Sequence, residues 1–209
     1  MYLSATTDLS TLTISKKKIT ANTRLVIINH ASNVIGTVQP LEEIGRICRE
    51  HDVAFAIDAS QSAGKVPIDI EQMYIDIVAF TGHKSLLGPT GIGGLYVREG
   101  VEIRHTRAGG TGVRSAARMH LDEYPYRLEY GTGNVVGIAG IHAGLKWIEE
   151  KGMDQIHHHE MELTRMLRDG PRETDGVLLY GQDELENHIA VRDRKSVGEG
   201  KGVDRGGGR

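Results

Sequence analysis

Three short apolar runs constrain the fold of this chain more than any other feature of its sequence. They are LVIINHASN (25–33), VAFAID (53–58) and IDIVAF (75–80), and each continues into polar residues. Continuous apolar runs of this length are typical of buried parallel strands. Between the first two lies PLEEIGRICREHD (40–52), which has one apolar helical face and Pro40 at about its first turn. The order strand, helix, strand, loop with a short helix, strand predicts an α/β fold.

The segments that follow extend this sheet and cover it. GIGGLYVRE (91–99) predicts a fourth strand, which we expect to be antiparallel because its connection to the third is too short for a helical crossover. Residues 104–134 have no periodicity and predict a long irregular loop. Residues 135–152 and 154–169 have helical patterns, and the first is rich enough in glycine and alanine for close packing.

Composition excludes several classes of function. The 209 residues are 39% hydrophobic and 25% charged, which fits a globular protein. A net charge of −3 provides no basic surface for nucleic acid, and no run approaches the ~18 apolar residues that a membrane helix requires. The single cysteine, Cys48, suits a reducing cytoplasm, and its place on the apolar face of the 40–52 helix predicts a buried structural thiol.

Phosphate-loop and metal motifs do not explain the polar residues at the strand ends. GHKS (82–85) and AGKV (63–66) each lack part of the P-loop pattern, and no G-x-G-x-x-G follows the first strand. The contiguous histidines 157–159 point to different sides of a predicted helix, so they do not converge on one ion. We therefore expect no metal site.

Asp58 and Lys84 are the strand-end charges whose position demands an explanation. A carboxylate at the end of an apolar strand is costly without a cationic partner, so the two could form a structural ion pair. The alternative is pyridoxal 5′-phosphate, which requires a lysine for its aldehyde and an acid beside its pyridinium nitrogen. Such a lysine must be partly desolvated, so that neutral amine is available. These two residues by themselves leave both interpretations open.

Several motifs at consistent spacing narrow the choice. HASNVIGTVQP (30–40), AIDASQSAGKVPIDI (56–70), AFTGHKSLLGPTGIGGLYV (79–97) and RLEYGTGN (127–134) resemble the signature segments of class V aminotransferase-fold enzymes. The best match is the branch of cysteine desulfurases and selenocysteine lyases. The resemblance covers roughly residues 20–190. It implies the fold type I of pyridoxal-phosphate-dependent transferases, with this chain forming the C-terminal half of the large domain, a mostly parallel sheet flanked by helices.

The resemblance implies a catalytic role for two residues. Lys84 would bond to the cofactor aldehyde as a Schiff base and later move the substrate Cα proton. Asp58 would pair with the pyridinium nitrogen and keep it protonated, so that the ring accepts electrons from the substrate.

The resemblance also implies cofactor contacts for five other residues. Gln61 and Asn33 would lie near the phenolic oxygen of the ring, and Thr81 and His83 would bind the 5′-phosphate. Thr132 would reach the phosphate of a neighbouring subunit, which implies a homodimer. Without the resemblance, these are ordinary turn residues, a strand cap, a half-buried histidine and a loop threonine.

By composition and resemblance together, the chain divides into four segments. These are a connecting segment (1–24) with an edge strand around 12–14, the cofactor-binding large domain (25–152), the start of a small domain (153–191) with a strand at 177–181, and a charged, glycine-rich tail (192–209). The tail predicts disorder and resembles translated adapter sequence. We expect the family's upstream segment and most of its C-terminal domain to be missing, and a chain of this kind to be marginally stable and prone to aggregate.

The resemblance favours a cysteine desulfurase, which converts cysteine to alanine and passes persulfide sulfur to an acceptor protein. Class V aminotransferase, selenocysteine lyase and epimerase activities are alternatives within the same fold. A non-catalytic binding module is an alternative of a different class, although such a scaffold has no reason to keep both Lys84 and Asp58.

Overall fold

The computed structural model describes residues 18–114, 116–172, 185 and 188–190. The strands expected around 12–14 and at 177–181, and the tail at 192–209, lie outside these residues. Within the described ranges, no helix combines the length and the hydropathy needed to cross a bilayer.

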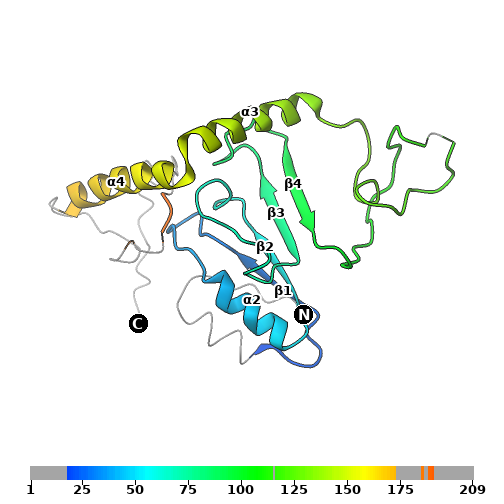
Figure 1. Ribbon diagram of the computed structural model, residues 1–209, viewed down its shortest axis with the longest axis horizontal. Coiled ribbons are helices and arrows are strands. Elements are labelled where there is room, and N and C mark those ends of the chain that lie inside the picture. The colour runs from blue at the N-terminus through cyan, green and yellow to red at the C-terminus, as the bar shows by residue number, and fades with distance from the viewer. Residues whose placement is uncertain (1–17, 115, 173–184, 186–187, 191–209) are drawn as a thin grey trace, which may run out of the picture.

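A four-stranded sheet forms the centre of the molecule (Figure 1). Its strands lie in sequence order: β1 (Leu25–Asn29), β2 (Ala54–Asp58), β3 (Ile77–Thr81) and β4 (Gly93–Val97). The pairs β1–β2 and β2–β3 are parallel, whereas β3–β4 is antiparallel. The α/β class and the direction of the fourth strand are therefore confirmed.

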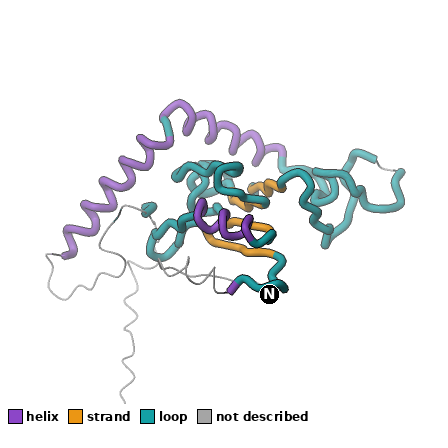
Figure 2. The backbone as a smooth tube through the Cα atoms, turned by 60° about the horizontal axis from the view of Figure 1, so that its bottom comes forward, coloured by secondary structure: helices purple, strands orange, loops and turns teal. Residues whose placement is uncertain are grey.

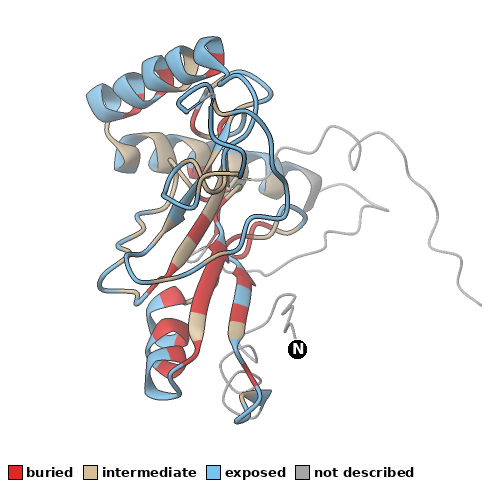
Figure 3. Cartoon of the chain, turned by 90° about the vertical axis from the view of Figure 1, so that its right-hand side faces the viewer, coloured by how far each residue is buried: buried red, intermediate tan, exposed pale blue. Residues whose placement is uncertain are grey.

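The sheet has one covered face and one open face. Successive side chains of a strand point to opposite faces, so the register assigns each residue to one of them. Helix α2 (Leu41–Glu50) packs against the covered face, and Figure 3 shows the buried residues concentrated in the strands and on α2. The core of this layer is Val26, Ile28, Phe55, Ile57 and Val78 from the strands, with Leu41, Ile44 and Cys48 from α2.

The connection from β2 to β3 differs from expectation. We predicted a loop with a short helix there, but residues 59–74 form successive turns without a helix. The backbone N–H groups of Ala63 and Val66 donate to the backbone carbonyls of Ala59 and Ser62, respectively. The Met73 N–H donates to the backbone carbonyl of Asp69. Each turn contains only one or two hydrogen bonds between a residue and the one four positions earlier. The first helical turn is costly to form, and here no further turns follow to offset that cost, so no helix forms.

Two further helices confirm the helical patterns at 135–152 and 154–169. Helices α3 (Val135–Lys151) and α4 (Met153–Arg172) follow one another with a bend at Gly152 (Figure 2). Residues 98–114 and 116–134 form an irregular excursion, which was expected over 104–134 and which extends away from the sheet beyond the end of β4 (Figure 1).

Helix α3 packs against the turn that follows β3, and its glycines allow the close approach. A Cβ on Gly144 would collide with the carbonyl oxygen of Leu86, and one on Gly140 would meet the ring of Pro89. The expectation of close packing by a glycine- and alanine-rich helix is therefore confirmed. This contact holds the 82–89 turn, which carries Lys84, against a regular element.

Candidate active site

A depression of about 380 Å³ on the open face of the sheet brings two of the expected site residues together. Asp58 at the end of β2 and Thr81 at the end of β3 both line it. Its floor includes the small residues Ala56, Ala79 and Gly94. Ligands of open α/β sheets bind beside the carboxyl ends of the strands, and this depression reaches that edge.

Asp58 is held at this edge by strand pairing and by a hydrogen bond between its side chain and the turn that follows it. It pairs with Asn29 of β1 and Ala79 of β3 in the sheet register, and its carboxylate Oδ1 accepts the Ser60 backbone N–H at 2.8 Å. Among the described residues, the carboxylate makes no other hydrogen bond. One carboxylate oxygen is therefore available to an incoming group.

Thr81 and His83 are also brought together. Thr81 Oγ1 and His83 Nδ1 lie 2.8 Å apart, within hydrogen-bonding distance. Thr81 ends β3, and the turn after it is closed by two bonds to Gly82, whose N–H donates to Ile92 O and whose carbonyl accepts the Gly88 N–H. The hydroxyl and imidazole thus form a polar pair at the end of β3.

Lys84 lies in this turn, and the structure bears on two points raised about it. We considered a structural ion pair between Asp58 and Lys84, but no salt bridge among the described residues joins them. The partial desolvation that a Schiff-base lysine requires is also not found, because Lys84 is exposed, as is Asp58. The physical reason is the open face of the sheet: nothing in the described part of the chain covers it.

The remaining expected residues are spread over three other segments. Asn33 is exposed in the turn after β1, where Ser32 Oγ accepts the N–H groups of Val34 and Ile35. Gln61 is half-buried in the turn after Asp58. Thr132 is exposed in the excursion, just before α3. None of these three residues lines the depression, and neither do His83 and Lys84. The roles of all the expected site residues therefore remain predictions.

Asn134 has a positioning role that the sequence reasoning missed. Its side chain accepts the Gly137 N–H at the start of α3 and donates to the Gly91 carbonyl before β4. Asn is a preferred N-cap residue, and its position directly before a helical pattern was a signal that could have revealed this role. It links the YGTGN motif to the turn that follows Lys84.

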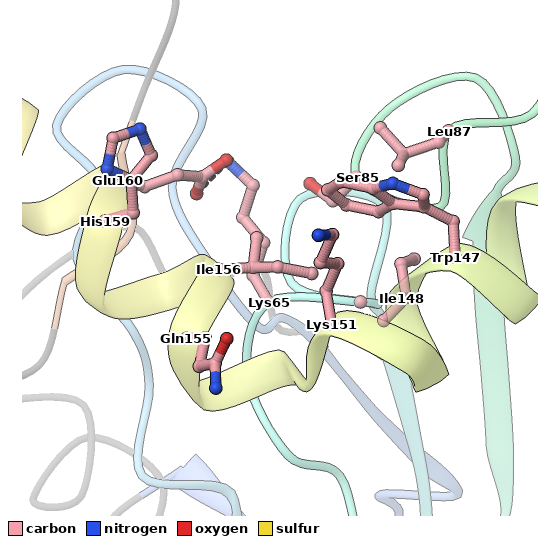
Figure 4. Close-up of a pocket in the computed structure, with 11 residues that line it drawn as sticks. Lys65, Ser85, Leu87, Trp147, Ile148, Lys151, Gln155, Ile156, His159 and Glu160 are labelled. Atoms are coloured by element: carbon pink, nitrogen blue, oxygen red, sulfur yellow. Dashed lines mark ion pairs between the residues drawn. The ribbon is translucent and has the colours of Figure 1, made fainter.

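Lys65 is the second residue that the sequence reasoning missed. It follows Gln61 in the turn after β2, and its Nζ lies 2.8 Å from Glu160 Oε2 on α4 and 3.2 Å from the Ala190 carbonyl. Figure 4 shows this pair beside a second cavity of about 350 Å³, which Trp147, Lys151 and residues of the Lys84 turn also line. The partners are distant in sequence, so no local pattern could have predicted the pair.

Two buried titratable groups flank the sheet. His30 follows β1 and is 2% exposed, and burial lowers its pKa from 6.5 to about 4. Cys48 is buried on α2, as expected, and burial raises the pKa of its thiol to about 11, with a smaller contribution from Asp76. A thiol of this kind is neutral at physiological pH and shielded from solvent, which makes it a structural cysteine.

These donor and acceptor groups fit pyridoxal 5′-phosphate. The carboxylate of Asp58 has an unengaged oxygen for a protonated ring nitrogen, and the small side chains on the floor of the depression leave room for a flat ring. Thr81 and His83 can donate to a phosphate, and the amine of Lys84 forms no ion pair in the described part of the chain. These four residues are part of the larger set that the resemblance implied.

Comparisons with known proteins identify the family to which the chain belongs. The sequence model of the family "Aminotransferase class-V" matches residues 3–194. A probable cysteine desulfurase of Pyrococcus abyssi is 35% identical over 181 residues, which are 85% of this chain and 45% of that protein. The cysteine desulfurase IscS of Vibrio campbellii is 35% identical over 182 residues, or 87% of this chain and 41% of its own length.

Solved structures show the same relationship. The apo cysteine desulfurase of Thermococcus onnurineus NA1 superposes with a TM-score of 0.71 at 32% identity, covering 86% of this chain and 45% of that one. A structure described as SspA in complex with cysteine has a TM-score of 0.55 at 36% identity, covering 65% of this chain and 36% of that one. The chain spans less than half the length of these relatives. The family model matches most of the chain, and the chain therefore belongs to the class-V aminotransferase family, with the type I fold of that family.

Proposed function

We propose that this chain carries the cofactor-binding centre of a pyridoxal-phosphate-dependent enzyme that removes sulfur from cysteine. The observation that carries the proposal is the arrangement at the carboxyl ends of β2 and β3. There, Asp58, with one free carboxylate oxygen, and Thr81 line one depression, the hydroxyl of Thr81 lies within hydrogen-bonding distance of His83, and Lys84 follows in the adjoining turn. The names of the relatives supply the reaction: cysteine desulfurase.

Each residue would have a distinct task. Asp58 would hold a proton on the ring nitrogen, because a carboxylate next to that nitrogen favours its charged form. Thr81 and His83 would orient the phosphate, with Asn33 and Gln61 beside the ring oxygen. Lys84 would bind the aldehyde carbon through its amine and then move the proton at the substrate Cα. When bound, the cofactor supplies an electron sink for the carbon atom that loses this proton.

The overall reaction transfers one sulfur atom. The C–S bond of cysteine breaks, and an S–S bond forms between that sulfur and an acceptor thiol. The carbon that loses sulfur gains a hydrogen in exchange for the proton that the acceptor thiol gives up. Cysteine and a thiol thus give alanine and a persulfide. Cys48 is unsuited to be that thiol, because it is buried and its pKa is raised to about 11. The acceptor must therefore be another cysteine, on this enzyme beyond the present sequence or on a partner protein.

We further propose that the site is completed in a homodimer. Thr132 lies in the irregular excursion before α3, is exposed and does not line the depression on its own sheet. A second subunit could present this threonine to the phosphate. A cytoplasmic location, suggested by the single cysteine and by the resemblance, stays a prediction.

Two alternatives keep the site but change the outcome. An aminotransferase or selenocysteine lyase would use the same Lys84 and Asp58 with another substrate. The related structure that was solved with cysteine favours a sulfur-containing amino acid. A non-catalytic binding module would retain the fold without needing a lysine amine at this turn.

The test is a titration of the 209-residue chain with pyridoxal 5′-phosphate, followed by borohydride reduction and peptide mapping. We expect a saturable absorption band and a reduced adduct on the peptide that contains Lys84. Lys84→Ala should abolish both, whereas Lys146→Ala, which removes an exposed lysine of α3, should leave both unchanged. An adduct spread over several lysines, or one that survives in Lys84→Ala, would overturn the assignment of Lys84. A second assay measures alanine formed from cysteine by the full-length protein. If the adduct forms on Lys84 but no alanine appears, the alternatives are favoured.

A further inference from the structure

The edge of the sheet opposite to the candidate active site carries a cluster of arginines. Arg24 directly precedes β1, and Arg98 directly follows β4. Because β4 runs antiparallel to its neighbours, its last residue reaches the edge at which the parallel strands begin. Arg49, in the last turn of α2, reaches the same edge. The topology therefore gathers three guanidinium groups that are far apart in sequence.

These arginines line one pocket. It has a volume of about 270 Å³ and is lined by Arg24, Arg49 and Arg98, with Tyr74, Asp52, Asp76 and the beginning of β2. A second hollow of about 280 Å³ shares Arg49, Tyr74, Asp76 and Arg98. Three positive charges face two negative ones in the first pocket, so its formal charge is positive at neutral pH.

The guanidinium of Arg98 is fixed in place. Its Nε donates to Asp76 Oδ1 at 2.6 Å, and Asp76 Oδ2 accepts the backbone N–H of Phe55 at 2.7 Å. The Asp76 side chain is 10% exposed, so this carboxylate is anchored in the core. The Nη groups of Arg98 make no hydrogen bond within the described residues, so they are left to donate into the pocket.

Arg24 and Arg49 have no acidic partner among the described residues. The salt bridges and cation–π contacts of this part of the chain engage neither of them. By contrast, Arg46, one turn earlier on α2, pairs with Glu50 at 2.7 Å. Unpaired guanidinium groups that converge on one cavity can bind a tetrahedral oxyanion through charge-assisted, bidentate hydrogen bonds.

We propose that this pocket, formed by Arg24, Arg49 and Arg98 at the amino edge of the sheet, binds a phosphate group. The cavity accommodates inorganic phosphate, and Tyr74 provides an aromatic wall for the organic part of a small phosphate monoester. The site is separate from the one proposed for the cofactor, because the two lie at opposite ends of the parallel strands.

Calorimetric titration of the full 209-residue chain tests this proposal, with inorganic phosphate as the probe in buffers whose ionic strength is matched with chloride. We expect saturable phosphate binding that Arg24→Gln and Arg49→Gln each weaken about ten-fold or more, the size expected for the loss of one charge-assisted hydrogen bond. Arg46→Gln is the matched control on the same helix and should bind as the unmodified chain does. Arg49→Lys, which keeps the charge, should bind more tightly than Arg49→Gln.

Two further arms identify the site and the source of the phosphate. His83→Gln weakens phosphate binding at the cofactor site but should leave the arginine-dependent binding intact. Phenyl phosphate that binds more tightly than inorganic phosphate would indicate a monoester that uses Tyr74, and equal affinity would indicate free phosphate. The proposal is wrong if phosphate binds no better than chloride, if Arg24→Gln and Arg49→Gln bind normally, or if Arg46→Gln loses as much affinity as they do.

Discussion

The two faces of the central sheet differ in how far their side chains are buried. The covered face is a closed core, in which Phe55 of β2 and Ile44 of α2 are fully buried. The open face carries Ile27, which is 38% exposed, and the exposed carboxylate of Asp58 beside the depression. The same strands supply both faces, so the comparison separates residues that stabilise the fold from residues that are available for chemistry.

The largest expected effect is a difference in stability between the two faces. Phe55→Ala should lower the free energy of unfolding by about 3–5 kcal/mol, because it leaves a cavity in a closed core. Ile27→Ala on the open face should cost less than about 1 kcal/mol, because its side chain already contacts solvent. Urea unfolding of both variants measures the two values. Equal losses would show that the open face is covered in solution, for example by self-association.

The next effect concerns His30, which extends β1 at the end of the covered layer. Its pKa in the folded state is about 4, against 6.5 for a free histidine, because burial disfavours the charged ring. The unfolded chain therefore binds a proton at a higher pH than the folded chain. Stability is complete above about pH 6.5 and decreases by about 3 kcal/mol as the pH falls to about 4.

Unfolding measured between pH 7.5 and 4 checks this sign and size. His30→Leu should remove most of the slope, whereas His51→Asn, at the exposed end of α2, should keep it. Burial also lowers the pKa of His188, so a smaller slope in the same direction should persist in His30→Leu. A wild-type slope in His30→Leu would contradict the assignment to this residue.

The smallest effect on stability is expected at Asp58. Asp58→Ala removes an exposed carboxylate whose one hydrogen bond is to the Ser60 N–H, so the unfolding free energy should change by less than about 0.5 kcal/mol. The same variant should bind pyridoxal 5′-phosphate much more weakly than the unmodified chain. Asp69→Ala is a suitable control, because Asp69 also accepts backbone N–H groups in a turn but lies away from the depression. Loss of stability without loss of cofactor affinity would indicate a structural role for Asp58.

Exposed apolar surface on α3 is relevant to the expected stability and aggregation of the chain. Large apolar side chains are exposed on α3, such as Val135, Val136 and Ile138. Surfaces of this kind normally mark contacts with other protein segments. Marginal stability and aggregation remain predictions, and a cooperative melt of a monodisperse sample would contradict them.

Much of the site could be predicted because its residues stand at strand ends that local patterns reveal. The apolar runs before Asp58 and Thr81 placed both residues at one edge of a parallel sheet, and the structure places both in one depression. The partial desolvation expected of Lys84 is not found, because both Lys84 and Asp58 are exposed. Whether a strand end is covered depends on which segments pack over it, and sequence periodicity does not encode that.

By itself, the sequence determined the order of the elements and the face of α2 that meets the sheet, since both follow from the spacing of apolar residues along a short segment. It also determined, through its motifs, the family to which the chain belongs. Only the tertiary structure decided that Lys65 reaches Glu160, that Asn134 ties α3 to the turn before β4, and that Arg24, Arg49 and Arg98 share a pocket. The reason is physical: these groups meet through sheet register and strand direction, which join residues that no local pattern connects.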